Sequence, residues 1–207
     1  MEQGYGNSVN LVVALPAEAK PLIAKLNLKR DQKNMTLPLY SAGRIRLVVT
    51  GPGASAAAQG VHSIHHLSPS SHAHWINIGI CGHGSLAIGT PLLADRIIDK
   101  RSGGTQSLAI PRQFSDTAGS LTCVSKPQAD YAADMAYDME SWGFIEAVTA
   151  LDRSLSATVF KIVSDNPDNN AQHISGKFVH MLMQQHLDMI QSLIDLSRHS
   201  DSFPVPQ

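Results

Sequence analysis

The sequence predicts an α/β protein with three layers, in which helices cover both faces of a central, twisted and mostly parallel (mixed) sheet. Two observations predict this class. Short apolar runs rich in β-branched residues alternate along the chain with segments of helical composition, and parallel strands require such helical crossovers. In addition, the chain has 207 residues, of which 43% are hydrophobic, so it can bury a substantial core. Because it contains no linker or repeat, residues 1–207 are expected to form a single domain.

Three strands and two helices are expected in the first 80 residues. Proline or glycine ends the early apolar runs, since Pro16 follows the first run and Gly51-Pro52-Gly53 follows the second. The segment after that glycine turn is rich in alanine and has no proline, which favours a helix. The expected strands cover residues 9–15, 44–50 and 75–80, and the expected helices cover residues 17–26 and 54–67.

The rest of the chain continues the alternation and ends in an amphipathic segment. Apolar side chains recur there at helical spacing, at Phe178, Leu182, Met189, Ile190, Leu193 and Ile194. The expected strands cover residues 91–98, 121–124 and 158–163, the expected helices cover 138–151 and 175–198, and residues 200–207 are expected to be a flexible tail.

The charge balance excludes several classes of protein. The 16 basic residues nearly cancel the 17 acidic ones, so neither disorder nor nucleic-acid binding through a basic field is expected. The chain has no run of about 20 apolar residues and no basic N-terminal leader, so membrane insertion and secretion are not expected. Its two distant cysteines favour the cytoplasm. The charged fraction of 16% is below the ~25% usual for soluble domains, which favours a homodimer or a higher homo-oligomer.

Residues suited to chemistry follow three of the expected strands. Gly51-Pro52-Gly53, the glycine-rich stretch 79–84 and Ser164-Asp165 each stand where a strand ends, and Glu18 lies near the start of the first helix. In sheets of this kind, ligands bind at the carboxyl ends of the strands. The sequence therefore predicts a binding site that gathers these segments at one edge of the sheet.

Some of these segments have simpler interpretations. Gly51 and Gly53 fit the dinucleotide-binding pattern G-x-G-x-x-A, but the next strand lacks the acidic residue that would hold a ribose, so a tight turn is favoured. Gly79, Gly82 and Gly84 either let backbone N–H groups approach a ligand or form a sharp turn at the sheet edge.

Metal and cofactor sites are not expected. A helix would place His62 and His66 on one face, but no carboxylate or cysteine joins them, so a polar surface is the favoured interpretation.

Two acidic positions also have structural alternatives: Asp138 can cap a helix, and Asp165 can form an Asx-turn.

Five segments together form a more specific pattern. They are residues 11–22 (LVVALPAEAKPL), 48–58 (VVTGPGASAAA), 76–95 (INIGICGHGSLAIGTPLLAD), 138–147 (DMESWGFIEA) and 160–168 (FKIVSDNPD). In this order they resemble the nucleoside phosphorylase and nucleosidase superfamily, and most closely its methylthioadenosine/S-adenosylhomocysteine nucleosidase branch. The resemblance implies an N-ribosyl hydrolase that cleaves the glycosidic bond of a purine nucleoside such as methylthioadenosine or S-adenosylhomocysteine.

The resemblance also implies a role for each matched residue. Asp165 would be the general acid that protonates the purine at N7, and Glu18 would position and deprotonate the attacking water. Glu140 would accept hydrogen bonds from the ribose hydroxyls, while Met139 would pack on the sugar. Further substrate-binding positions implied in this way are Ser164, Gly79, Ile80, Gly82 and Gly51.

Departures from the family pattern leave two alternatives open. Ile80 stands where the nucleosidases commonly have a serine, and the segment before Asp138 that normally contacts the base is short, which favours a non-catalytic nucleoside-binding protein. The other alternative is a purine nucleoside phosphorylase, which needs arginines to bind phosphate. Arg44 and Arg46 stand at the start of a strand, away from the predicted site, so hydrolysis is favoured over phosphorolysis.

Overall fold

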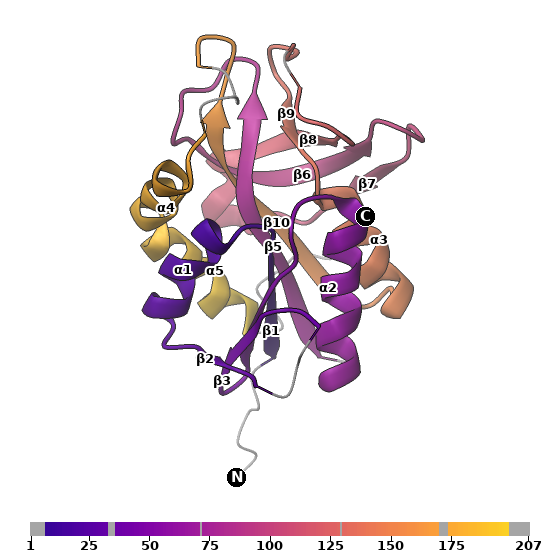
Figure 1. The fold of residues 1–207 in the computed structure, drawn as a ribbon. Helices are drawn as coiled ribbons and strands as arrows, with labels where there is room; N and C mark the ends of the chain where they lie inside the picture. The colour runs from indigo at the N-terminus through magenta and orange to yellow at the C-terminus, as the bar shows by residue number, and fades with distance from the viewer. Residues whose placement is uncertain (1–6, 33–35, 71, 129, 170–173, 199–207) are drawn as a thin grey trace.

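The computed structural model describes residues 7–32, 36–70, 72–128, 130–169 and 174–198. Over these residues the chain forms a mixed α/β fold, with helices packed against a large sheet (Figure 1). The predicted α/β class is therefore confirmed. The predicted tail, residues 200–207, lies outside the described residues.

Four parallel strands form the centre of the sheet, in the order β4-β1-β5-β10. They correspond to four of the expected strands, because these segments are the most apolar and β-branched of the chain. Since the four strands are parallel, their carboxyl ends lie at one edge of the sheet, as predicted. Their bounds are β1 (Ser8–Val13), β4 (Ile45–Val49), β5 (Ala73–His83) and β10 (Ser156–Asp165).

The remaining strands make the sheet less parallel than the sequence predicts. Among the described residues, five of the ten strand pairings are antiparallel. Four of the remaining strands have only two to four residues each, too few for a recognisable apolar run, so the sequence pattern misses them. The strands expected at residues 91–98 and 121–124 correspond to β6 (Pro91–Asp99) and β8 (Ala118–Cys123). The strands that the sequence did not predict are β2 (Lys29–Arg30), β3 (Leu39–Ala42), β7 (Thr105–Ser107) and β9 (Ala136–Asp138).

At its upper end in Figure 1 the sheet closes into a ring. β10 pairs with β6, β6 with β8, β8 with β9, β9 with β5, and β5 again with β10. This closure brings the chain around β9 next to the carboxyl ends of β5 and β10. The ring therefore positions residues near 131–140 beside the residues that end the parallel strands.

Helices cover both faces of the sheet. On β1, Leu11 points into a core shared with Leu22 and Val179, whereas its neighbour Val12 points into a second core with Val61 and Phe144. None of the helices in the described residues is long and apolar enough to cross a membrane. The first core receives α1 (Pro16–Lys25), α4 (Gly176–Gln185) and α5 (Leu187–Ser197), and the second receives α2 (Ala54–Leu67) and α3 (Ser141–Leu151).

Two helices differ from their expected bounds. The C-terminal amphipathic segment is two helices rather than one, because it breaks at His186, whose ring Nε2 lies 2.7 Å from the Gly89 carbonyl oxygen. The helix expected from residue 138 begins at Ser141. Asp138 belongs to β9, and its carboxylate accepts hydrogen bonds from the backbone N–H (2.9 Å) and the hydroxyl (2.6 Å) of Ser141. The N-cap of α3 is Glu140, which makes no side-chain cap hydrogen bond, so Asp138 fixes the turn before the helix and is not its cap.

Candidate active site

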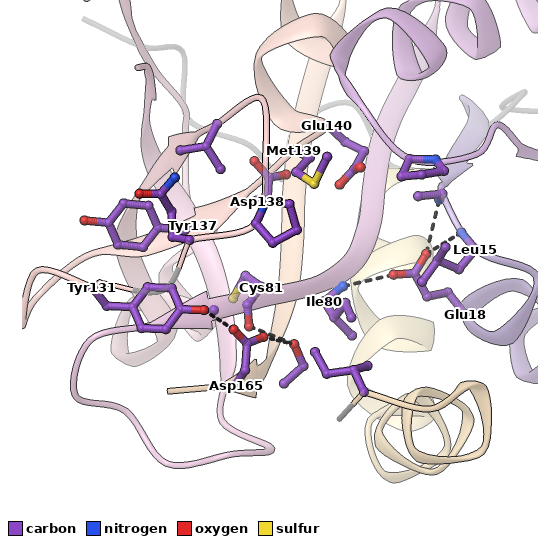
Figure 2. A pocket seen from close by; sticks show the side chains of 18 residues that line it. Leu15, Glu18, Ile80, Cys81, Tyr131, Tyr137, Asp138, Met139, Glu140 and Asp165 are labelled. Carbon is purple, nitrogen blue, oxygen red and sulfur yellow. Dashed lines mark hydrogen bonds between the residues drawn. The ribbon is translucent and has the colours of Figure 1, made fainter. Parts of the chain in front are cut away.

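A pocket of about 200 Å³ lies where the parallel strands end, at the predicted edge of the sheet. Its walls come from the start of α1, the end of β5, the segment before β9, the β9–α3 junction and the end of β10 (Figure 2). The fold thus brings together segments that are far apart in the sequence. Seven of the nine predicted site residues line the pocket: Glu18, Ile80, Gly82, Met139, Glu140, Ser164 and Asp165.

Glu18 is held in the first turn of α1 by backbone donors. Its Oε2 accepts hydrogen bonds from the N–H groups of Ala14 (3.1 Å) and Leu15 (2.8 Å), and its Oε1 accepts one from the N–H of Ile80 (3.1 Å). A carboxylate has about four lone-pair sites, so one remains for a water. Burial raises the pKa of Glu18 to about 7, although backbone donors and the charge of Lys161 act in the opposite direction. Such a pKa suits a general base at neutral pH.

Residues 79–83 of the glycine-rich stretch continue β5 and do not form the predicted turn, and Gly84 follows the strand. β10 pairs with β5 in parallel as far as Gly82, which keeps the stretch extended. Gly79 and Gly51, unlike the other predicted residues, do not line the pocket. A Cβ on Gly79 would lie 2.8 Å from Glu18 Oε1, so glycine lets this carboxylate approach the strand. Gly51 has a φ of 82° in the turn after β4, a conformation that favours glycine.

Asp165 is the last residue of β10 and does not lie in the predicted turn. The pairing with β5 shifts register just before Asp165, which forms a β-bulge at Ser164, and bulges often redirect side chains beside a site. Asp165 Oδ1 accepts a hydrogen bond from Ser164 Oγ at 2.6 Å, and Oδ2 accepts one from the hydroxyl of Tyr131. Both carboxyl oxygens of Asp165 therefore have a donor.

Met139 and Glu140 connect β9 to α3. Glu140 Oε1 accepts a hydrogen bond from the N–H of Gly53 at 2.7 Å, so the turn after β4 holds this carboxylate. The contact gives Gly53, whose φ is 105°, a structural role and agrees with the tight turn favoured from the sequence. Burial raises the pKa of Glu140, while the positive charge of Lys161 opposes that rise.

Lys161 is a buried cation among these carboxylates, and the sequence motifs do not single it out. Its side chain is 1% exposed, and Nζ lies 2.8 Å from Asp138 Oδ2 and 3.8 Å from Glu140 Oε2. Burial alone would lower the pKa of Lys161, but the negative charges of Asp138 and Glu140 outweigh it and raise the pKa. The ammonium group therefore stays charged. A lysine inside the apolar run 158–163 was a usable sign, because lysine is rarely buried unless it is paired.

Tyr131 closes the pocket on the side of Asp165. Its phenol oxygen donates a hydrogen bond to Asp165 Oδ2, as Figure 2 shows. A Cβ on Gly82 would lie 2.8 Å from ring atoms of Tyr131, and a Cβ on Gly84 would lie 1.9 Å from the Ala132 carbonyl oxygen. These two glycines therefore make room for the segment before β9. Tyr131 could be suspected from the sequence only as an aromatic residue in the segment that precedes Asp138.

The pocket is acidic. Four carboxylates line it, those of Glu18, Asp138, Glu140 and Asp165. Within the described part of the chain, neither arginine nor lysine lines the pocket, and Lys161 lies behind it, paired with Asp138. Glu18 contacts β5 at Ile80, and Asp165 pairs with β5 two residues further on. Two carboxylates therefore flank the end of one strand.

The histidines between residues 62 and 74 lie in different surroundings. His62 and His66 are exposed on α2. His74 is buried in β5 with Nε2 2.8 Å from the hydroxyl of Thr158, and burial lowers its pKa to about 3. Among the residues that the structure describes, no group of three or more His, Cys, Asp or Glu side chains is arranged to hold a metal ion.

Comparisons with known proteins find similarity in structure and none in sequence. No protein-family model matches the chain, and no curated protein matches its sequence. Among solved structures, the 5′-methylthioadenosine nucleosidase of Arabidopsis thaliana has a TM-score of 0.77 at 17% identity, with 93% of this chain and 96% of that chain covered. The match thus spans nearly all of both chains.

Two further solved structures have the same fold. A Streptococcus pneumoniae 5′-methylthioadenosine/S-adenosylhomocysteine nucleosidase with a transition-state inhibitor has a TM-score of 0.75 at 15% identity, covering 90% of this chain and 97% of that chain. The futalosine hydrolase of Helicobacter pylori has a TM-score of 0.75 at 12% identity, with the same coverage. At such low identity the likeness shows the fold alone. The predicted resemblance to the nucleosidases is confirmed at that level.

Proposed function

We propose that the protein is an N-ribosyl hydrolase that cleaves the glycosidic bond of a purine nucleoside, such as methylthioadenosine or S-adenosylhomocysteine. One observation carries the proposal: Glu18, Glu140 and Asp165 line a single pocket at the carboxyl edge of the sheet. The buried Glu18, with a pKa of about 7, is suited to remove a proton from water. The nucleosidases and the hydrolase that share the fold support the same activity.

Asp165 would supply the proton that the leaving base requires. In its protonated form it gives that proton to N7 as the bond between C1′ and the purine N9 breaks, and the electrons of this bond move to the base. The base then leaves as a neutral molecule rather than as an anion. Ser164 Oγ, 2.6 Å from Asp165 Oδ1, holds the carboxyl group in position for this transfer.

The remaining carboxylates would act on the sugar. As the bond breaks, C1′ and the ring oxygen of the ribose share a positive charge, which nearby negative groups stabilise. Glu140 would accept hydrogen bonds from the 2′- and 3′-hydroxyls, with Met139 against the sugar. Glu18 would take a proton from water while the water oxygen bonds to C1′. Water thus supplies the hydroxyl group of the released sugar.

The acidic lining favours water over phosphate as the nucleophile. Phosphate is an anion and is usually held by arginine or lysine. The Lys161 ammonium group is already 2.8 Å from Asp138, and no cationic side chain of the described residues lines the pocket. The carboxylates that line the pocket would repel a phosphate anion, whereas they do not repel an uncharged water molecule.

Assays of base release test the proposal directly. The purified protein is incubated with a panel of purine nucleosides, with and without phosphate, and the free base is measured. We expect release that does not depend on phosphate. Release only in the presence of phosphate would identify a phosphorylase instead, and binding without any release would identify a non-catalytic nucleoside-binding protein.

Asp165→Asn tests the proposed acid. The amide cannot transfer the proton, so we expect kcat to fall by about 10²–10⁴-fold with an unchanged circular dichroism spectrum. Asp95→Asn, at an exposed position of β6, is the matched control and should keep wild-type kcat. Wild-type turnover in Asp165→Asn would remove Asp165 from this role.

A further inference from the structure

The pocket is small for a nucleoside, and Tyr131 lines it at the end next to Asp165. Its volume of about 200 Å³ is below the ~300 Å³ at which ligand pockets commonly begin. A neighbouring hollow of about 960 Å³ shares Met139 with it, but neither Tyr131 nor Asp165 lines that hollow, so the additional room is not at Asp165. The side chain of Tyr131 lies beside Asp165 (Figure 2). Under the proposed function, this is the end of the pocket that must receive the purine.

The contact between Tyr131 and Asp165 also conflicts with the proposed proton transfer. Tyr131 donates its hydroxyl hydrogen to Oδ2, and Ser164 Oγ donates to Oδ1 at 2.6 Å. N7 of a purine is an acceptor, so it needs a hydrogen carried by one of these two oxygens. Tyr131 and Ser164 each occupy a lone-pair site on one of these oxygens, so the base competes with one of these donors for access to Asp165.

Tyr131, rather than Ser164, is placed to leave. Ser164 is 3% exposed, lies within β10, and its Oγ is also 3.2 Å from the Cys81 carbonyl oxygen. Tyr131 is half-buried, lies outside the strands and helices, and is followed by three exposed residues. Its ring also packs against Gly82, which has no side chain to interlock with it, and contacts Tyr137, with ring centroids 5.4 Å apart. A rotation of Tyr131 would free Oδ2 without disturbing β10.

We propose that Tyr131 is a displaceable cap on Asp165, which the purine base replaces on binding, so that Tyr131 sets the affinity of the base subsite. The inference rests on the proposed function, because it assumes that a purine meets Asp165. In the free protein the phenol satisfies Oδ2 of Asp165. In the complex N7 takes its place at that oxygen, and the volume of the ring becomes available to the base.

Binding of adenine tests the cap without any turnover. Tyr131→Phe keeps the ring and removes the hydroxyl, so the base no longer competes with a charge-assisted hydrogen bond. Isothermal titration calorimetry should show adenine bound about tenfold more tightly than by the wild type. Tyr40→Phe, on β3 and away from the pocket, is the matched control and should bind adenine as the wild type does. Equal or weaker binding by Tyr131→Phe would overturn the inference.

Steady-state kinetics separate a cap from a catalytic group. A cap predicts that Tyr131→Phe lowers KM about tenfold, and that this change in KM exceeds any change in kcat. A large fall in kcat at unchanged KM would show that Tyr131 takes part in proton transfer, and would overturn the cap. Tyr131→Ala, which also removes the ring, should bind adenine at least as tightly as Tyr131→Phe.

The cap and the proposed function fail in different ways. If the wild type releases base but Tyr131→Phe binds adenine no more tightly, the cap is wrong and the hydrolase proposal stands. If the wild type releases no base but Tyr131→Phe binds adenine more tightly, the cap is supported and hydrolysis is not. Thermal melting of each variant confirms that the comparison is made between folded proteins.

Discussion

At the scale of single residues, burial determines the chemistry of Glu18. The side chain is 2% exposed, and loss of hydration raises its pKa to about 7. A base acts only after it has lost its proton, so kcat/KM should fall as the pH drops below about 7. Folding disfavours the charged form of Glu18, so the folding free energy should also become less favourable as the pH rises through the same value.

Glu18→Gln tests both consequences. The amide has no proton to lose, so we expect kcat to fall by about 10²–10⁴-fold and the loss of stability between mildly acidic and neutral pH to diminish. Kinetics and urea unfolding at several pH values measure the two effects. Glu146→Gln, at an exposed position of α3, should change neither, and a fully active Glu18→Gln enzyme would refute the role of Glu18 as base.

Lys161 is the residue on which the charge balance of the site depends. Lys161→Met would leave Asp138 and Glu140 buried without their counter-charge, which costs about 3–5 kcal/mol when a buried pair loses one partner. Urea unfolding should show this loss, and adding Asp138→Asn to Lys161→Met should recover part of it. Lys20→Met, at an exposed position of α1, is the control. Wild-type stability in Lys161→Met would mean that the carboxylates simply take up protons.

At the scale of secondary structure, the end of β5 organises the site through its glycines. Gly79 leaves room for Glu18, Gly82 for Tyr131, and Gly84 for the chain at Ala132. The pattern in the sequence favoured either contact with a ligand or a sharp turn. The structure has an extended strand through His83 in place of the turn, and contact with a ligand stays a prediction for Gly82, which lines the pocket. The same glycine composition serves both purposes, because a missing side chain lets any group approach the backbone.

Gly84→Ala tests this packing. The added methyl group would lie 1.9 Å from the Ala132 carbonyl oxygen, so the segment that carries Tyr131 has to shift. We expect a loss of about 1–3 kcal/mol, as for other overpacked sites, visible as a lower Tm in differential scanning fluorimetry. Gly176→Ala, at the start of α4 with its nearest neighbour 3.7 Å away, should leave Tm unchanged or slightly raised. An unchanged Tm in Gly84→Ala would contradict the close packing.

At the scale of the whole molecule, the closed ring of strands completes the pocket. Parallel strands alone would bring Glu18 and Asp165 to one edge, but the ring through β6, β8 and β9 adds the wall that contains Tyr131 and Glu140. The homodimer or higher homo-oligomer and the single domain expected from the sequence stay predictions. The near-neutral charge of the chain gives no hint that one pocket gathers four carboxylates.

Much of the fold and of the site was predictable from local patterns. Apolar runs ended by proline, glycine or polar residues predict the four central strands, because such strands need continuous apolar sequence and a defined end. The short strands β2, β3, β7 and β9 carry no such pattern, and their existence depends on the neighbours they pair with. Motifs likewise indicated Glu18, Glu140 and Asp165, since these lie at the ends of predicted elements.

By itself, the sequence determined the α/β class, the carboxyl edge of the sheet as the binding edge, and the acidic groups expected there. Only the tertiary structure decided that Lys161 pairs with Asp138 and that Tyr131 donates to Asp165. The physical reason is distance along the chain. Helix and strand patterns arise from neighbouring residues, whereas these two contacts join residues from different elements and exist only because the ring of strands places those elements side by side.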